Sequence, residues 1–134
     1  MGLDQYAYRV KHQNVISDLS FKHGRLLSDG VTDELGNDLG FDYWRKFYPL
    51  NRWACGIYVK KSGKGEFDCA EVRLDKEDLD ELYVLTQTDE FYQNGYYEDA
   101  KKERELEYAH LMKFIENAKT AISEGDAIYY SNWE

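Results

Sequence analysis

The alternation of apolar and polar residues predicts strands at both ends of the chain and one near its middle. The segment 5–11 places aromatic and β-branched side chains at every second position, which is typical of a strand. Residues 66–74 alternate less regularly and are interpreted as a central strand, and 127–133 as a closing strand. We expect the two terminal strands to be neighbours in one sheet.

Three segments carry apolar residues at helical spacing. Pro49 suits the first turn of a helix that ends at residues 60–63, where basic residues precede a glycine. Asp75 stands at the N-cap position before a second helix, whose first turn is acidic. The longest predicted helix spans 97–123, and Gly125 stands where a C-terminal cap belongs.

Residues 14–42 show weaker periodicity. Glycines and acidic or amide residues separate short apolar pieces, so we interpret this region as loops with a hairpin. The elements together predict an α+β fold, with a small, mainly antiparallel sheet of N-terminal, central and C-terminal strands packed on about three helices. We expect residues 1–134 to form a single globular domain.

Composition narrows the class of protein. The chain of 134 residues is 43% hydrophobic and carries a net charge of −9, which argues against general nucleic-acid binding. Cys55 and Cys69 have no metal or redox spacing and are interpreted as small buried residues. The sequence has no signal-peptide pattern and no long apolar run, so we expect a cytoplasmic protein without a membrane partner.

Charge is distributed unevenly along the chain. The segment 43–64 holds six basic residues and no carboxylate, interleaved with aromatic residues. Guanidinium forks and aromatic rings in this pattern favour an anionic ligand, such as a nucleotide or a phosphate. In the alternative, which we prefer, Trp44, Trp53 and Tyr58 belong to the core, while the cations lie in water or pair with acidic residues. In either case we expect the segment to be folded, with its cations at the surface.

Other candidate sites have simpler interpretations. The acidic run 29–38 does not match the spacing of a calcium loop, and we expect a solvated turn. His12, His23 and His110 share no metal-binding spacing, and His110 is interpreted as a structural residue on the long helix. No motif implies a cofactor, a metal or a catalytic nucleophile, so the sequence leaves open whether the protein is an enzyme.

Three pieces of the chain resemble a family of small bacteriophage and bacterial proteins. The pieces are the opening MGLDQY, the run YWRK at 43–46 followed by Trp53, and the closing IYYSNWE at 128–134. Members typically open MGLDMYL, contain YWRK and close on a YYSSW-like tail; the segment 91–97 departs from their pattern. The family has no established activity. The resemblance implies an accessory protein and marks the set Asp4, Tyr43, Trp44, Arg45, Lys46, Trp53, Tyr130, Ser131 and Trp133.

We therefore predict a small phage-type or bacterial accessory protein that binds a protein partner from the phage or its host. The alternative is an enzyme or small-ligand binder in which Arg45, Lys46 and Arg52 hold an anion, assisted by Asp4. A third hypothesis is contact with single-stranded nucleic acid through the segment 43–64 alone. Self-association of identical chains stays open.

Overall fold

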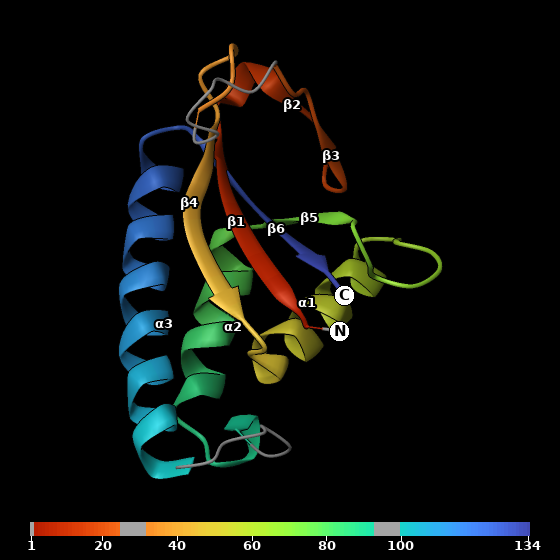
Figure 1. Ribbon diagram of the computed structural model, residues 1–134. Coiled ribbons are helices and arrows are strands. Elements are labelled where there is room, and N and C mark those ends of the chain that lie inside the picture. Colours follow the sequence, from red (N-terminus) through yellow and green to blue (C-terminus); the bar gives the residue numbers. More distant parts are fainter. Residues whose placement is uncertain (1, 25–31, 93–99) are drawn as a thin grey trace.

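The computed structural model describes residues 2–24, 32–92 and 100–134, and it confirms the predicted α+β class. Three α-helices and a four-stranded antiparallel sheet form the main body (Figure 1). The strands of this sheet are β1 (Asp4–Val10), β4 (Asp38–Arg45), β5 (Glu71–Leu74) and β6 (Ala127–Trp133). The helices are α1 (Tyr48–Lys60), α2 (Lys76–Thr86) and α3 (Ala100–Ser123). Shorter elements are the strands β2 (Val15–Ser17) and β3 (Ser20–Phe21) and the 3₁₀ turns His12–Asn14 and Glu90–Tyr92.

The sheet has the order β4-β1-β6-β5, so the two terminal strands lie side by side, as predicted. Strand β1 pairs along its whole length with β6, from Asp4 opposite Trp133 to Val10 opposite Ala127. On its other side β1 pairs with β4, and the register shifts between Ala7 and Arg9. Because successive side chains of a strand point to opposite faces, this register fixes which residues face the helices.

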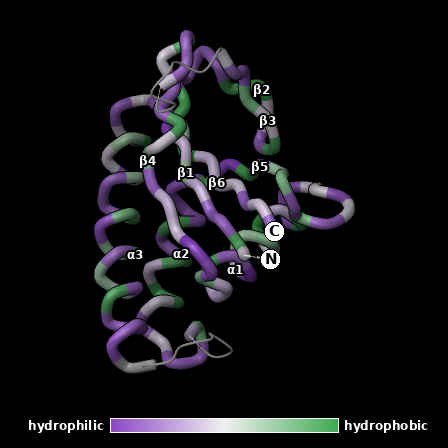
Figure 2. Tube along the Cα trace, viewed as in Figure 1, coloured by the Kyte–Doolittle hydropathy of each residue, from purple (hydrophilic) through white to green (hydrophobic). Residues whose placement is uncertain are grey.

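The main core lies between the helices and one face of the sheet. Its central side chains come from every helix and from β5 and β6, and most are fully buried: Leu50, Ile57, Val72, Leu74, Leu79, Leu82, Leu111, Phe114, Ala118 and Ile128. Along α3 the hydropathy alternates between core and solvent positions (Figure 2). An amphipathic helix of this kind is stabilised chiefly by the apolar stripe that it packs against the sheet.

The predicted helix boundaries follow from their capping residues. Pro49 lies in the first turn of α1 as expected, and its missing N–H costs no helical hydrogen bond there. Asp75 precedes α2 in a capping box, in which its own N–H donates to the Asp78 carboxylate at 2.9 Å. Gly125 follows α3 with φ of 95°, a conformation that favours glycine. Of the predicted helix 97–123, residues 97–99 fall outside the described residues.

Strand β4 was missed by the sequence interpretation, which assigned the region 14–42 to loops and a hairpin. Trp44 is the one buried residue of β4, so buried and exposed side chains do not alternate along this strand as they do along a typical half-buried strand. The predicted hairpin exists, but it comprises only β2 and β3. The central strand is shorter than the predicted 66–74, because Cys69 has φ of 57° and regular pairing begins at Glu71.

The free edge of β4 is protected by a side chain. The backbone N–H of Tyr43 donates to the carboxylate of Asp42 at 2.8 Å. This hydrogen bond satisfies a backbone donor at the outer edge of the sheet. The same carboxylate is bonded to His110 Nε2 of α3 at 2.6 Å. Asp42 therefore helps to blunt an edge that another strand could otherwise extend.

Among the described residues, no helix is long and apolar enough to cross a membrane.

Candidate binding face

Three of the residues predicted to bind a ligand are buried on the helix side of the sheet: Trp44, Trp53 and Tyr130. Trp44 is 3% exposed and packs its ring on His110 and against the edge of Phe114. Trp53 of α1 donates its indole N–H to Glu81 of α2 at 3.0 Å. Their placement, with that of Tyr58, agrees with the alternative that these rings belong to the core.

Tyr130 belongs to a buried polar network at the start of α1. Its hydroxyl donates to Asn51 Oδ1 at 2.9 Å and accepts from Gln5 Nε2 at the same distance. Gln5 also bonds both backbone groups of Phe47, and Asn132 donates to Asn51 Oδ1 and to Phe67 O. Buried amides with bonded neighbours fix the position of α1 on the sheet, so the network is structural.

The opposite face of the sheet is called the open face here, and no helix of the described residues lies over it (Figure 1). The hairpin β2–β3 covers one part of this face. Phe21 stacks on His23 with ring centroids 4.0 Å apart and lies 4.8 Å from the ring of Tyr129. The Tyr129 hydroxyl donates to the backbone oxygens of Ser17 and Ser20, and Arg73 N–H donates to Asp18 O. These bonds hold the hairpin against β5 and β6.

The other part of the open face carries exposed aromatic side chains. Two cross-strand rows define it: Arg45, Asp4 and Trp133 in one, and Tyr43, Tyr6 and Ser131 in the next. Trp133 is 59% exposed and Tyr43 is 46% exposed. We call the residues Asp4, Tyr6, Tyr43 and Trp133 the aromatic patch.

Contacts inside the aromatic patch hold Asp4, Tyr6 and Tyr43 in place. The rings of Tyr6 and Tyr43 have centroids 5.3 Å apart and are tilted by 50°. Tyr43 donates its hydroxyl hydrogen bond to Asp4 Oδ1 at 2.6 Å, and this bond raises the pKa of the Tyr43 phenol. Side chains on three paired strands need little further ordering to bind a partner.

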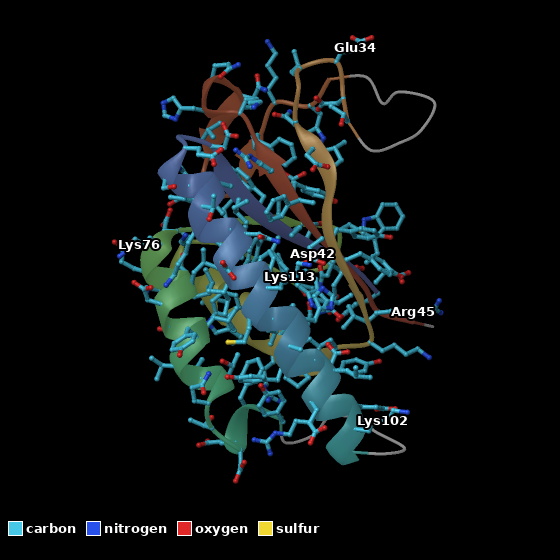
Figure 3. All side chains as sticks on the ribbon, turned by 90° about the vertical axis from the view of Figure 1, so that its left-hand side faces the viewer. Glu34, Asp42, Arg45, Lys76, Lys102 and Lys113 are labelled. Carbon is cyan, nitrogen blue, oxygen red and sulfur yellow. The ribbon has the colours of Figure 1, made fainter. Side chains whose placement is uncertain are left out.

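The predicted anion-binding cations are divided between two places. A Cβ placed on Gly2 would lie 3.1 Å from Arg45 Nη2 and 3.5 Å from Lys46 Cε, so these two side chains lie together beside Gly2. Figure 3 shows Arg45 directed away from the helices. Arg52 instead lies on α1, where its Nη2 donates to Phe91 O at 3.1 Å. The structure therefore brings Arg45 and Lys46 together and gives Arg52 different neighbours.

One cation of the segment 43–64 is not at the surface, which corrects an expectation from the sequence. The side chain of Lys61 is 9% exposed, and its Nζ donates to Asp75 at 2.9 Å and to Asp78 at 2.7 Å. Burial opposes the positive charge, but the two carboxylates outweigh it and raise the pKa of Lys61. This ion pair links the end of α1 to the start of α2.

Two further expectations are corrected by burial. Cys69 is exposed rather than buried, and Cys55 is half-buried. Within the run 29–38, Asp33 and Asn37 are buried instead of solvated. Asp33 accepts hydrogen bonds from Gly24 N, Leu35 N and both nitrogens of Asn37, and although burial opposes its charge, these bonds lower its pKa. The carboxylate organises a turn, and residues 29–31 fall outside the described residues.

A polar pair borders the aromatic patch near the hairpin. His23 Nε2 lies 2.9 Å from Glu71 Oε1, and burial raises the pKa of the Glu71 carboxyl. Glu71 is paired with Ser131, itself 3% exposed, at the end of the row that contains Tyr6. The sequence analysis did not mark Glu71 and Tyr6 as site residues. Only the strand register places them on this face, and the register is set by pairing between distant segments.

Two grooves lie elsewhere on the described part of the molecule. One of about 480 Å³ is lined by Thr86, Gln87, Arg104, Glu105 and Tyr108, and one of about 300 Å³ by Pro49, Arg52, Trp53, Leu85, Thr88, Glu90 and Phe91. In the second groove, Arg52 bonds Phe91 O and the Trp53 N–H bonds Glu81, so polar groups there already serve the fold. No group of three or more His, Cys, Asp or Glu side chains in the described ranges could hold a metal ion.

No family model, curated protein or solved structure matches the chain.

Proposed function

We propose that the protein is a cytoplasmic accessory protein that binds another protein through the aromatic patch. One observation carries the proposal: Trp133 and Tyr43 are 59% and 46% exposed on one face of the sheet, whereas Trp44 and Trp53 are buried. The sequence resemblance to phage and bacterial proteins supports the same role.

The physical argument rests on where aromatic residues contribute to binding. Tyrosine and tryptophan are enriched among the few residues that dominate protein interfaces, since they bury a large area with few rotatable bonds. The hairpin already covers a neighbouring part of the open face by the same means, with Phe21 packed on Tyr129 and Tyr8. A partner segment that lies over Trp133 and Tyr6 would extend this packing.

Photo-crosslinking from a defined position tests the proposal. A benzoylphenylalanine residue in place of Trp133 is expected to capture one partner from a bacterial extract, and one in place of Tyr83 on α2 is not. Tyr83 is a matched control because it is an exposed aromatic residue, 47% accessible, on the helix side. The partner is then purified and titrated with Trp133→Ala, which we expect to weaken binding at least about tenfold. Equal binding by wild type and Trp133→Ala would refute the proposal.

A second candidate function is binding of a small anion where Arg45 and Lys46 lie together beside Gly2. A ligand that binds only the folded protein raises its melting temperature by mass action. Millimolar phosphate and nucleotides should then stabilise the wild type and not the Arg45→Gln variant. Equal melting temperatures with and without these anions would exclude it.

A further inference from the structure

The partner's chemistry can be inferred from the charges around the aromatic patch, on the basis of the proposed function. Two acidic residues lie next to the backbone at Trp133, one on a neighbouring strand and one in a neighbouring loop. Asp4 is the direct cross-strand partner of Trp133 on β1. On the other side, Asp68 Oδ1 accepts the backbone N–H of Glu134, the residue next to Trp133, at 3.0 Å. An exposed indole on a surface with acidic neighbours favours a cation.

The Asp4 carboxylate has room for a further donor. Its Oδ1 accepts the Tyr43 hydroxyl, and across the described ranges no other side-chain hydrogen bond or ion pair of Asp4 is formed. A half-buried carboxylate between aromatic rings is a strong acceptor for a charged donor, because charge-assisted hydrogen bonds are about twice as strong as neutral ones. Asp4 is thus the group in the aromatic patch that is suited to bond a partner's cation.

The protein's own nearby cations do not occupy this position. Arg45 stands opposite Asp4 in the sheet, but no Asp4–Arg45 ion pair forms within the described residues, and the Arg45 guanidinium lies beside Gly2. Glu71 contributes another carboxylate to the open face, bonded to His23. The whole chain, at −9, adds a long-range field that attracts positive segments.

We infer that the partner presents an arginine or lysine side chain, which stacks on Trp133 and pairs with Asp4. The aliphatic stem of such a residue covers the ring while its charged end reaches the carboxylate. A basic peptide segment is therefore the class of ligand that this surface selects.

Selection from a displayed random peptide library tests the inference. Peptides bound by the wild type and not by Trp133→Ala should be enriched in Arg and Lys, and Tyr83→Ala should select the same peptides as the wild type. For one synthesised peptide, replacing its basic residue by Gln should weaken binding about tenfold, and Asp4→Asn should do the same. Asp4→Asn keeps the side-chain shape, and its unfolding curve checks that the fold is intact.

The outcomes separate the inference from the proposed function. Acidic or purely apolar peptides that still require Trp133 would overturn the inference and leave protein binding standing. Peptides that bind Trp133→Ala as tightly as the wild type would count against both. A thymidine oligonucleotide that binds more tightly than every selected peptide would also overturn the inference, in favour of single-stranded nucleic acid.

Ionic quenching of fluorescence supplies a readout that needs no partner. Trp44 and Trp53 are 3% and 8% exposed, so the difference between wild type and Trp133→Phe reports the exposed indole. Relative to the free neutral reference N-acetyltryptophanamide, caesium should quench this component more efficiently than iodide does, and Asp4→Asn should reduce the caesium effect. On this normalised scale, more efficient quenching by iodide would show a positive local potential and overturn the inference, including when the library enriches no peptide.

Discussion

The two faces of the sheet use aromatic residues in different ways. On the helix side, Trp44 and Phe114 are sealed into a core that includes all three helices. On the open face, Phe21 closes a smaller cluster, and beyond the hairpin Trp133 is left exposed. Alternate residues of β6 thus point to the helices or to the open face, as Tyr130 and Trp133 illustrate, and along β6 Trp133 is the exposed residue. An aromatic motif in the sequence therefore mixes two roles, and only strand register separates them.

The largest loss of stability is expected from a substitution in the helix-side core. Phe114, at 1% exposed, contacts the rings of Trp44 and Phe41. Phe114→Ala should lower the free energy of unfolding by about 3–5 kcal/mol, since it removes buried area and leaves a cavity. Urea denaturation measures the loss. Leu106→Ala on the same helix, at an exposed position, is the control and should change stability by less than about 0.5 kcal/mol.

The covered part of the open face should respond less. Phe21→Ala is expected to cost about 3 kcal/mol, the lower end of the range for a buried phenylalanine, because its cluster is small. Hydrogen exchange of Phe21→Ala, compared with the wild type, should be accelerated more in β2 and β3 than in β1 and β6. Equal acceleration over the whole sheet would mean that the hairpin and the main core unfold as one cooperative unit. The distinction between the two clusters would then be wrong.

Within the helix-side core, the polar network should matter less than apolar packing. Tyr130→Phe removes a hydroxyl that bonds Gln5 and Asn51, and leaves both amides buried with one partner fewer. We expect a loss of about 1–3 kcal/mol in urea denaturation. Tyr83→Phe removes an exposed hydroxyl and should be neutral. A neutral Tyr130→Phe would show that the network does not hold α1 in place.

The smallest of these effects depends on pH. The hydrogen bond to Asp42 raises the pKa of His110, against the effect of burial, and Glu107 is the other carboxylate that acts on the ring. The charged imidazole therefore stabilises the fold fully below the unfolded pKa of about 6.5. That stabilisation is lost as pH rises through the higher folded pKa. The contribution should be below about 1 kcal/mol, because the side chain is 36% exposed.

Urea denaturation of wild type and His110→Gln between pH 5.5 and 8.5 isolates the His110 contribution. Titrating groups that do not act on His110 are common to both proteins and cancel in the difference. The stability difference should shrink as pH rises. A difference that is constant with pH would contradict the assigned ion pair.

Local signals predicted the helices and the terminal strands well. Pro49, Asp75 and Gly125 act through their own backbone chemistry, so their roles can be inferred without the fold. The burial of Lys61 and the turn around Asp33 depend on contacts with other segments, which composition does not reveal.

The candidate site shows the same limit. Asp4, Tyr43, Arg45 and Trp133 were marked from motifs at distant positions, and the sheet places them in adjacent rows. The motif YWRK could not tell that Trp44 turns inward while its two neighbours turn outward. Strand β4 was not predicted, and the alternation within it decides this difference.

The stability of Trp133→Ala tests the central claim most directly, because the claim is that this ring serves binding and not the fold. Urea denaturation should give a free energy of unfolding within about 0.5 kcal/mol of the wild type, as for an exposed residue. A loss of about 3 kcal/mol, equal to that expected for Phe21→Ala, would show that Trp133 is part of a core and would contradict the account.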